Sequence, residues 1–181
     1  HDPAAIRRLY AEVLKSGRYE IYDHFGTTDP DGLISKMSYM RKALKCDVIL
    51  LDHISIMISG STGQMYESEA KRIDVFMTRL RSFIEETKVM VHAIVHLKRP
   101  QVGKSYNEGR RVALTDLRGS ASLEQLSDFV IALERDQQGK QQDISRLRVL
   151  KNRKTGKTGA ADTLAYNHKT GRLLQIGRAQ V

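Results

Sequence analysis

The chain has 181 residues, about the length of one domain, of which 40% are hydrophobic and 28% charged, with a net charge of +9. This composition excludes an intrinsically disordered chain, and no run of about 18 apolar residues indicates a membrane-spanning helix. The only cysteine, Cys46, excludes an internal disulfide and a cysteine-rich zinc site, and it favours a reducing compartment.

Helices and apolar strands alternate in the first half of the chain. The pattern predicts an amphipathic helix over residues 3–16, capped by Asp2, and a second helix from Asp29 to about Leu44. Between them, residues 19–24 alternate like a short strand. Residues 47–52 are a continuous apolar run that ends in an acid, which is typical of a parallel strand buried on both faces.

The second half ends in strands joined by short turns. After a loop at 53–67, the pattern predicts a helix at 68–87, a second buried strand at 89–95, an irregular loop at 97–114, a short helix at 119–127 and a third apolar strand at 129–133. A hairpin turn at 137–142 and a turn at 168–171 separate the last strands, at 144–151, 162–166 and 172–176. We therefore predict an α/β fold, with a mostly parallel sheet flanked by helices and antiparallel hairpins at one edge.

Positive charge is concentrated in two segments. Residues 140–181 carry ten basic and two acidic side chains, and a second basic excess lies at residues 98–111. Clustered cations favour binding to DNA or to nucleotide phosphates, although a solvated basic edge explains the charge equally well. The cations at 151–159 surround a loop that contains glycine, which is either a solvated hairpin or a phosphate contact.

Three polar residues lie where an α/β sheet binds ligands. Asp52 ends the first buried strand, His53 follows it, and His96 ends the second. Such an acid holds magnesium in phosphate-transfer enzymes, and such a histidine can sense phosphate. An acid or a histidine at the end of an apolar strand is also common where the residue has no function. Residues 116–128 place backbone amides at a helix start, which suits an anion or simply a capped helix. The segments 103–105 and 156–158 lack the earlier glycine of a phosphate-binding loop.

Several segments, taken together and in order, resemble the motifs of one family. They are residues 46–55, 95–98, 115–120, 125–128, 132–135, 150–153 and 155–159. The chain resembles the RecA-type motor domain of hexameric replicative helicases, above all podovirus primase–helicases, and is also similar to Twinkle and DnaB. The resemblance covers essentially the whole chain. It implies a RecA-like fold in which residues 1–181 are the C-terminal part of a single motor domain.

The resemblance also implies roles for individual residues. Asp52 would hold Mg²⁺, and His96 would sense the γ-phosphate of the NTP, ATP or dTTP. Arg153 would be an arginine finger that reaches the neighbouring subunit's nucleotide, with Lys151 near it. The side chains that would hold the nucleotide base are Arg135 and Tyr166. Those that would contact single-stranded DNA are Lys98, Arg99, Lys104, Arg118, Gly119 and Ser120.

The implied function is NTP-driven translocation on single-stranded DNA and duplex unwinding. The implied partners are identical subunits in a ring, a primase and a replicative polymerase, with no membrane. The location would be the cytoplasm of a phage-infected bacterium, or the mitochondrial matrix for a Twinkle-like protein. Because the chain begins at His1, we expect a piece of a longer protein. The family's phosphate-binding loop and catalytic glutamate would then lie upstream, leaving the isolated chain without NTPase activity. A RecA-type recombinase or mediator, or a DNA-binding module that has lost its nucleotide site, remains open.

Overall fold

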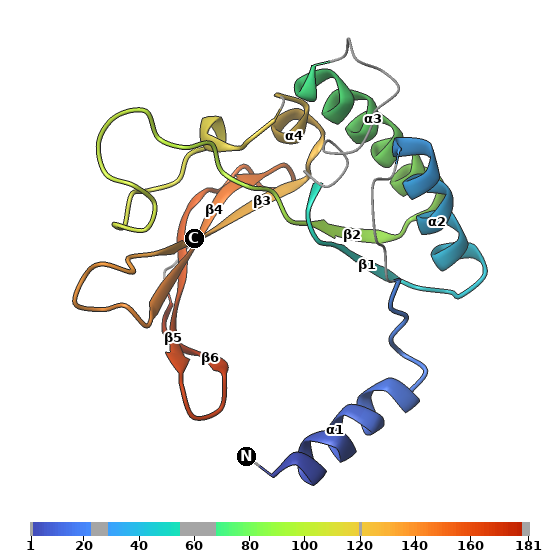
Figure 1. Ribbon diagram of the computed structural model, residues 1–181. Helices are drawn as coiled ribbons and strands as arrows, with labels where there is room; N and C mark the ends of the chain where they lie inside the picture. Colours follow the sequence, from blue (N-terminus) through green and yellow to red (C-terminus); the bar gives the residue numbers. More distant parts are fainter. Residues whose placement is uncertain (1, 23–28, 55–67, 120, 179–181) are drawn as a thin grey trace.

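A computed structural model describes residues 2–22, 29–54, 68–119 and 121–178 of the chain. The helices are α1 (Pro3–Lys15), α2 (Pro30–Lys42), α3 (Glu69–Thr87) and α4 (Ala121–Leu126), with a 3-10 turn at Leu114–Asp116. The strands are β1 (Val48–Leu51), β2 (Met90–Ala93), β3 (Phe129–Arg135), β4 (Ile144–Asn152), β5 (Gly159–Asn167) and β6 (Arg172–Arg178). Figure 1 shows their arrangement.

The N-terminal half is built on a parallel pair of strands. β1 pairs with β2 from Val48 opposite Met90 to Leu51 opposite Ala93. α2 and α3 lie on one side of this pair (Figure 1). α2 begins where predicted, because the Asp29 side chain accepts a hydrogen bond from the Gly32 N–H at 2.9 Å.

The hydrophobic core lies between the helices and the parallel pair. α3 contributes half of the buried core residues through an apolar stripe of helical period, whose centre, Phe76, has no exposed surface. The buried core residues are Met37, Ile49, Ile54, Ile73, Phe76, Met77, Leu80, Phe83, Val89 and Leu123. None of the residues of α1 is buried, and the helix stands apart from the other elements (Figure 1).

The C-terminal half is a four-stranded antiparallel sheet in the order β3-β4-β5-β6. The register places Phe129 opposite Asn152 and Arg135 opposite Ser145, so the turn at 137–142 closes a hairpin as predicted. β5 begins at Gly159, three residues before the predicted start at 162, because Gly159 and Ala160 pair with Val149 and Arg148. This four-stranded sheet and the turn after β4 carry the cations that the sequence predicts to contact the nucleotide.

Three sequence expectations need correction. Among the described residues, β1 and β2 are covered on one face only, and Leu50 is 77% exposed, because α2 and α3 pack on the same side. In the described part of the chain, parallel pairing is confined to β1 and β2, and β3 pairs with β4. Residues 19–22 form no strand, and the remainder of that predicted strand lies outside the described residues, as does nearly all of the 53–67 loop. Among the described helices, none is long and apolar enough to cross a membrane.

Candidate nucleotide and DNA site

The carboxyl ends of β1 and β2 bring three predicted polar residues together. Asp52 directly follows β1 and is exposed, and His96 lies three residues beyond β2. The rings of His53 and His96 meet edge to face, with centroids 4.5 Å apart. Parallel neighbours end at the same sheet edge, so the acid and the histidine reach one side of the molecule. The fold therefore gathers at one edge the residues that the sequence predicts to act together.

Asp52 has the donor chemistry that Mg²⁺ prefers, since its carboxylate oxygens are exposed at this edge. Among the described residues, no group of three or more His, Cys, Asp or Glu side chains could hold a metal ion. Mg²⁺ is usually bound through one or two carboxylates together with water and substrate phosphates. A single carboxylate at the sheet edge fits such an ion.

His96 is joined to the second predicted DNA segment by the backbone. Its carbonyl accepts a hydrogen bond from the Arg118 N–H at 2.8 Å. Leu97 and Leu117 form an antiparallel bridge, and the Lys98 N–H donates to the Asp116 carbonyl at 2.8 Å. These contacts pair the chain entering the basic loop, residues 97–111, with the chain leaving it. The predicted phosphate sensor and both predicted DNA segments thus share one short ladder.

The basic loop has no regular structure, as predicted, yet it is tied down at its base and tip. The Lys98 Nζ donates to the Thr115 carbonyl at 3.1 Å, while Arg99 and Lys104 are exposed. At the tip, the Gln137 N–H donates to the Asn107 carbonyl at 2.8 Å, which connects the loop to the β3–β4 hairpin. The loop therefore presents cations to solvent from a fixed base.

Tyr106 is the one aromatic residue of the basic loop, and it is half-buried. Burial, together with the neighbouring Asp116 carboxylate, raises the pKa of Tyr106 above its ordinary value. The Arg110 guanidinium lies 5.8 Å from the centre of its ring. The ring is therefore occupied by contacts within the protein, which leaves the exposed lysines and arginines as the main surface of the loop.

The segment at 118–120 is held against α3. Arg118 pairs with Glu69 at 3.2 Å, so its charge is already partly neutralised within the chain. Gly119 has a φ of +127°, and a Cβ there would lie 2.4 Å from Ile73 Cδ1. Glycine is therefore required at this close approach. Ser120 lies outside the described residues.

Lys151 and Arg153 are brought together, as predicted, at the end of β4. Lys151 Nζ donates to the Glu124 carbonyl and, at 3.2 Å, to that of Gln125. Arg153 Nη2 donates to the same Gln125 carbonyl at 2.5 Å, and Nη1 pairs with Asp128 at 3.2 Å. The last carbonyls of a helix carry partial negative charge, so the end of α4 is a favourable place for two cations.

Arg135 and Tyr166 both contact Asp143 or its partner His168, Arg135 through the Asp143 carboxylate and Tyr166 through the His168 ring. Arg135 approaches Asp143 at 3.8 Å and donates to the Gln142 carbonyl at 2.5 Å. His168 contacts the same carboxylate at 2.8 Å, and its ring lies 5.0 Å from that of Tyr166, edge to face. The two residues predicted to hold a nucleotide base are thus linked through Asp143 and His168.

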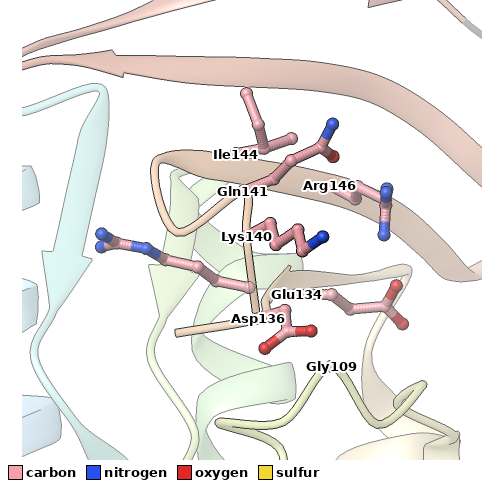
Figure 2. A pocket seen from close by; sticks show the side chains of 8 residues that line it. Gly109, Glu134, Asp136, Lys140, Gln141, Ile144 and Arg146 are labelled. Carbon is pink, nitrogen blue, oxygen red and sulfur yellow. The ribbon is translucent and has the colours of Figure 1, made fainter. Parts of the chain in front are cut away.

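A pocket of about 270 Å³ opens beside Arg135, between the tip of the basic loop and the β3–β4 hairpin (Figure 2). It is polar and carries both signs of charge. Its lining residues are Gly109, Glu134, Arg135, Asp136, Lys140, Gln141, Ile144 and Arg146. Of the residues predicted to hold nucleotide, Arg135 alone lines it, so the pocket is distinct from the edge that carries Asp52 and His96.

The sequence did not indicate an ion pair that connects the residue just after the basic loop to the sheet. Glu134 on β3 pairs diagonally with Arg148 on β4, with side chains 9% and 15% exposed and an N–O distance of 2.7 Å. Glu134 also accepts a hydrogen bond from the Val112 N–H at 2.9 Å. Burial alone would raise the pKa of Glu134, but these hydrogen bonds outweigh it and leave the pKa below its ordinary value.

Replacing Glu134 by glutamine should destabilise the fold at neutral pH by about 3 kcal/mol, the cost of breaking one partner of a largely buried pair. Because the pKa of Glu134 is lowered in the folded state, its contribution is complete above about pH 4.5 and is lost as the pH falls below that value. Urea unfolding at pH 7 and at lower pH measures this difference. Glu86→Gln, which breaks an exposed pair with Lys42, should change stability little. Equal stability of the Glu134→Gln and Glu86→Gln variants at pH 7 would contradict the role of the pair.

Known proteins similar to this chain include DNA helicases. A DNA helicase/primase of enterobacteria phage T3 is 48% identical over 162 residues, which are 90% of this chain and 28% of that protein. A replicative DNA helicase DnaB of Mycobacterium intracellulare is 28% identical over 137 residues, which are 76% of this chain and 21% of that protein. The chain thus spans about a quarter of the length of these curated relatives.

Solved structures at lower identity show the same fold. A DnaB-like replicative helicase, studied for its interactions with primase, superposes with a TM-score of 0.72 at 22% identity, covering 98% of this chain and 43% of that chain. A second solved structure, an ATPase domain, gives a TM-score of 0.64 at 23% identity, covering 83% of this chain and 52% of that chain. Both confirm the predicted RecA-like α/β class. The family of the DnaB-like helicase C-terminal domain matches residues 5–174, and the chain belongs to that family.

Proposed function

We propose that this chain is the C-terminal part of the motor domain of a replicative DNA helicase, in which NTP hydrolysis drives translocation on single-stranded DNA and duplex unwinding. The longer protein that contains the chain is termed the parent helicase below. The observation that carries the proposal is the hydrogen bond from the Arg118 N–H to the His96 carbonyl. Through it, a residue at the sheet edge proposed to bind nucleotide is joined directly to a segment proposed to contact DNA.

In this proposal the nucleotide lies at the carboxyl edge of β1 and β2. Asp52 holds Mg²⁺, which would neutralise charge on the transferring phosphoryl group when bound. His96 contacts the γ-phosphate, and a change in its position moves the start of the basic loop. Arg135 and Tyr166 hold the base. Arg153, with Lys151 beside it, reaches the nucleotide of the neighbouring subunit, which requires identical subunits arranged in a ring.

The DNA contacts are proposed to be contacts to the phosphate backbone. Lys98, Arg99 and Lys104 extend along the exposed basic loop, and Arg118 with Gly119 and Ser120 forms a second contact segment. A motor that moves along any sequence needs contacts to phosphates rather than to base edges. A primase and a replicative polymerase are proposed as further partners, and the bacterial cytoplasm as the place of action.

Asp52→Asn tests this function in the parent helicase. The variant should lose Mg²⁺-dependent NTP hydrolysis by about 100-fold or more, because a metal ion contributes several kcal/mol to charge stabilisation. Phosphate release and unwinding of a forked duplex are the measurements. The matched control is Asp47→Asn, at the opposite end of the same strand, where Asp47 pairs with Arg41 at 2.7 Å.

Each alternative predicts a different result for the unmodified parent. A DNA-binding module would bind single-stranded DNA without hydrolysing NTP. A recombinase would hydrolyse NTP and exchange strands without unwinding the fork. Either result, obtained with a correctly assembled protein, would contradict the helicase function.

A further inference from the structure

We propose that Asp128 is the positioning residue of Arg153, so that the arginine finger is aimed by a carboxylate of its own subunit. This inference rests on the proposed function, in which Arg153 stabilises charge on a nucleotide bound by the neighbouring subunit. Asp128 itself does not touch that nucleotide. It acts by fixing the direction in which the Arg153 guanidinium points.

Two hydrogen bonds join Asp128 to Arg153. The Asp128 carbonyl accepts from the Arg153 N–H at 2.8 Å, and its Oδ1 accepts from Arg153 Nη1 at 3.2 Å. The strand register explains this double contact, because Phe129 pairs with Asn152 at the end of the β3–β4 ladder. The next residue on each side, Asp128 and Arg153, therefore meets the other just beyond the sheet. Backbone and side chain are fixed by the same partner.

The guanidinium is also held from a second direction. Its Nη2 donates to the Gln125 carbonyl at 2.5 Å, close to the end of α4. These two contacts of the guanidinium use one hydrogen on each terminal nitrogen, and the group has five N–H donors. The Arg153 side chain stays 44% exposed. Donors therefore remain available for phosphate oxygens while the direction of the group is set.

Asp128 is in turn fixed to the core. Arg81 Nη1 donates to both carboxylate oxygens of Asp128 at 2.9 Å, and Arg81 belongs to α3, which supplies much of the buried core. Glu85 pairs with Arg81 at 2.7 Å, and the hydrogen bond to Glu85 is the largest cause that raises the pKa of Arg81. A series of contacts thus runs from the core helix through Arg81 and Asp128 to Arg153. A side chain held in advance loses less conformational entropy when it engages its target.

Asp128→Asn in the parent helicase isolates this effect. The substitution keeps the backbone bond and the side-chain volume but removes the charge that holds the guanidinium. We expect kcat for DNA-stimulated NTP hydrolysis to fall by roughly 10-fold to 100-fold, the equivalent of losing a hydrogen bond between charged groups. KM for the NTP should not change, because the nucleotide is bound by the other subunit. Asp128→Glu should recover part of kcat, and Glu86→Gln, an exposed acid on α3 paired with Lys42, is the control.

Mixed rings separate positioning from a general structural defect. Asp128→Asn subunits mixed with Asp52→Asn subunits should regain activity, because some interfaces then pair an intact Asp52 with an intact finger. Asp128→Asn mixed with Arg153→Ala should regain none, because every interface then has a damaged finger. In the Arg153→Ala background, Asp128→Asn should cause no further loss of kcat.

The outcomes distinguish this inference from the function beneath it. If Arg153→Ala leaves hydrolysis intact, the arginine-finger role fails and Asp128 has nothing to position. If Arg153→Ala abolishes hydrolysis while Asp128→Asn keeps the kcat of the unmodified protein, the role of Asp128 alone is overturned. Should Asp128→Asn fail to fold, Arg81→Gln releases the carboxylate from α3 and should lower kcat with KM unchanged. An unchanged kcat in that variant would equally overturn the proposal.

Discussion

Arg153→Ala in the parent helicase should reduce DNA-stimulated NTP hydrolysis by about 10³-fold to 10⁵-fold while leaving NTP binding largely intact. An arginine finger is worth this much in related phosphoryl-transfer systems because its charge acts when the phosphoryl group transfers. The structure fits this role, since the Arg153 side chain is 44% exposed and is oriented by Asp128 and the Gln125 carbonyl. Steady-state phosphate release and equilibrium binding of a fluorescent nucleotide measure the two quantities.

The proposed action of Arg153 on a neighbouring subunit can be tested separately and more strictly. Rings mixed from Arg153→Ala and Asp52→Asn subunits should recover activity at the interfaces where an intact Asp52 meets an intact Arg153. Each variant alone serves as the inactive control, and ring assembly is checked by size. Mixed rings of the correct size without recovered activity would show that Arg153 does not act on a neighbouring subunit.

The double change of Lys98 and Lys104 to alanine should weaken binding to single-stranded DNA evenly across sequences. The logarithm of the binding constant should also depend less steeply on the logarithm of salt concentration, by about 0.7 for each phosphate that the protein no longer neutralises. Removal of both lysines therefore flattens the slope by roughly 1.4. Hydrolysis without DNA should persist, because Asp52, His96 and Arg153 are unchanged. Fluorescence anisotropy across a range of salt concentrations measures both effects.

A matched pair of substitutions controls for the removal of charge itself. Lys15→Ala with Lys42→Ala removes the same two charges from the exposed surfaces of α1 and α2, away from the basic loop. This control should leave the salt slope unchanged. If the Lys98 and Lys104 variant behaves like the control, the basic loop is a solvated surface and does not contact the strand.

Local signals predicted most elements because their causes are local. Asp29 and Pro30 begin α2 through a cap that lies within four residues, and the stripe around Phe76 has the period of a helix that faces a core. The apolar run of β1 predicted a strand correctly but its burial wrongly. An apolar side chain indicates that burial would be favourable. Whether the side chain is in fact buried depends on where α2 and α3 pack. Leu50 faces the side that neither helix occupies.

In the candidate site too, the sequence predicted the residues whose positions have local causes and missed those that depend on long-range pairing. Asp52 and His96 could be placed together from the sequence because parallel strands end at a common edge. Asp128 and Glu134 could not be singled out, because their partners Arg153 and Arg148 come close only through the pairing of β3 with β4, and the second partner of Asp128, Arg81, comes from α3. The chain has 21 acidic residues, and the local sequence does not show which of them makes such a contact before the pairing of the strands is known. The missing information was long-range pairing rather than residue chemistry.

The hydrogen bond between the Arg118 amide and the His96 carbonyl affects how the sequence of this protein can evolve. Every residue carries a backbone carbonyl, and every residue except proline carries the N–H donor. Substitution at position 96 or 118 can therefore alter what each side chain recognises without cutting the connection between them. Only proline at 118 would remove the donor. If His96 contacts the nucleotide and Arg118 the DNA, as proposed, the link can persist while nucleotide preference and DNA affinity diverge on either side of it.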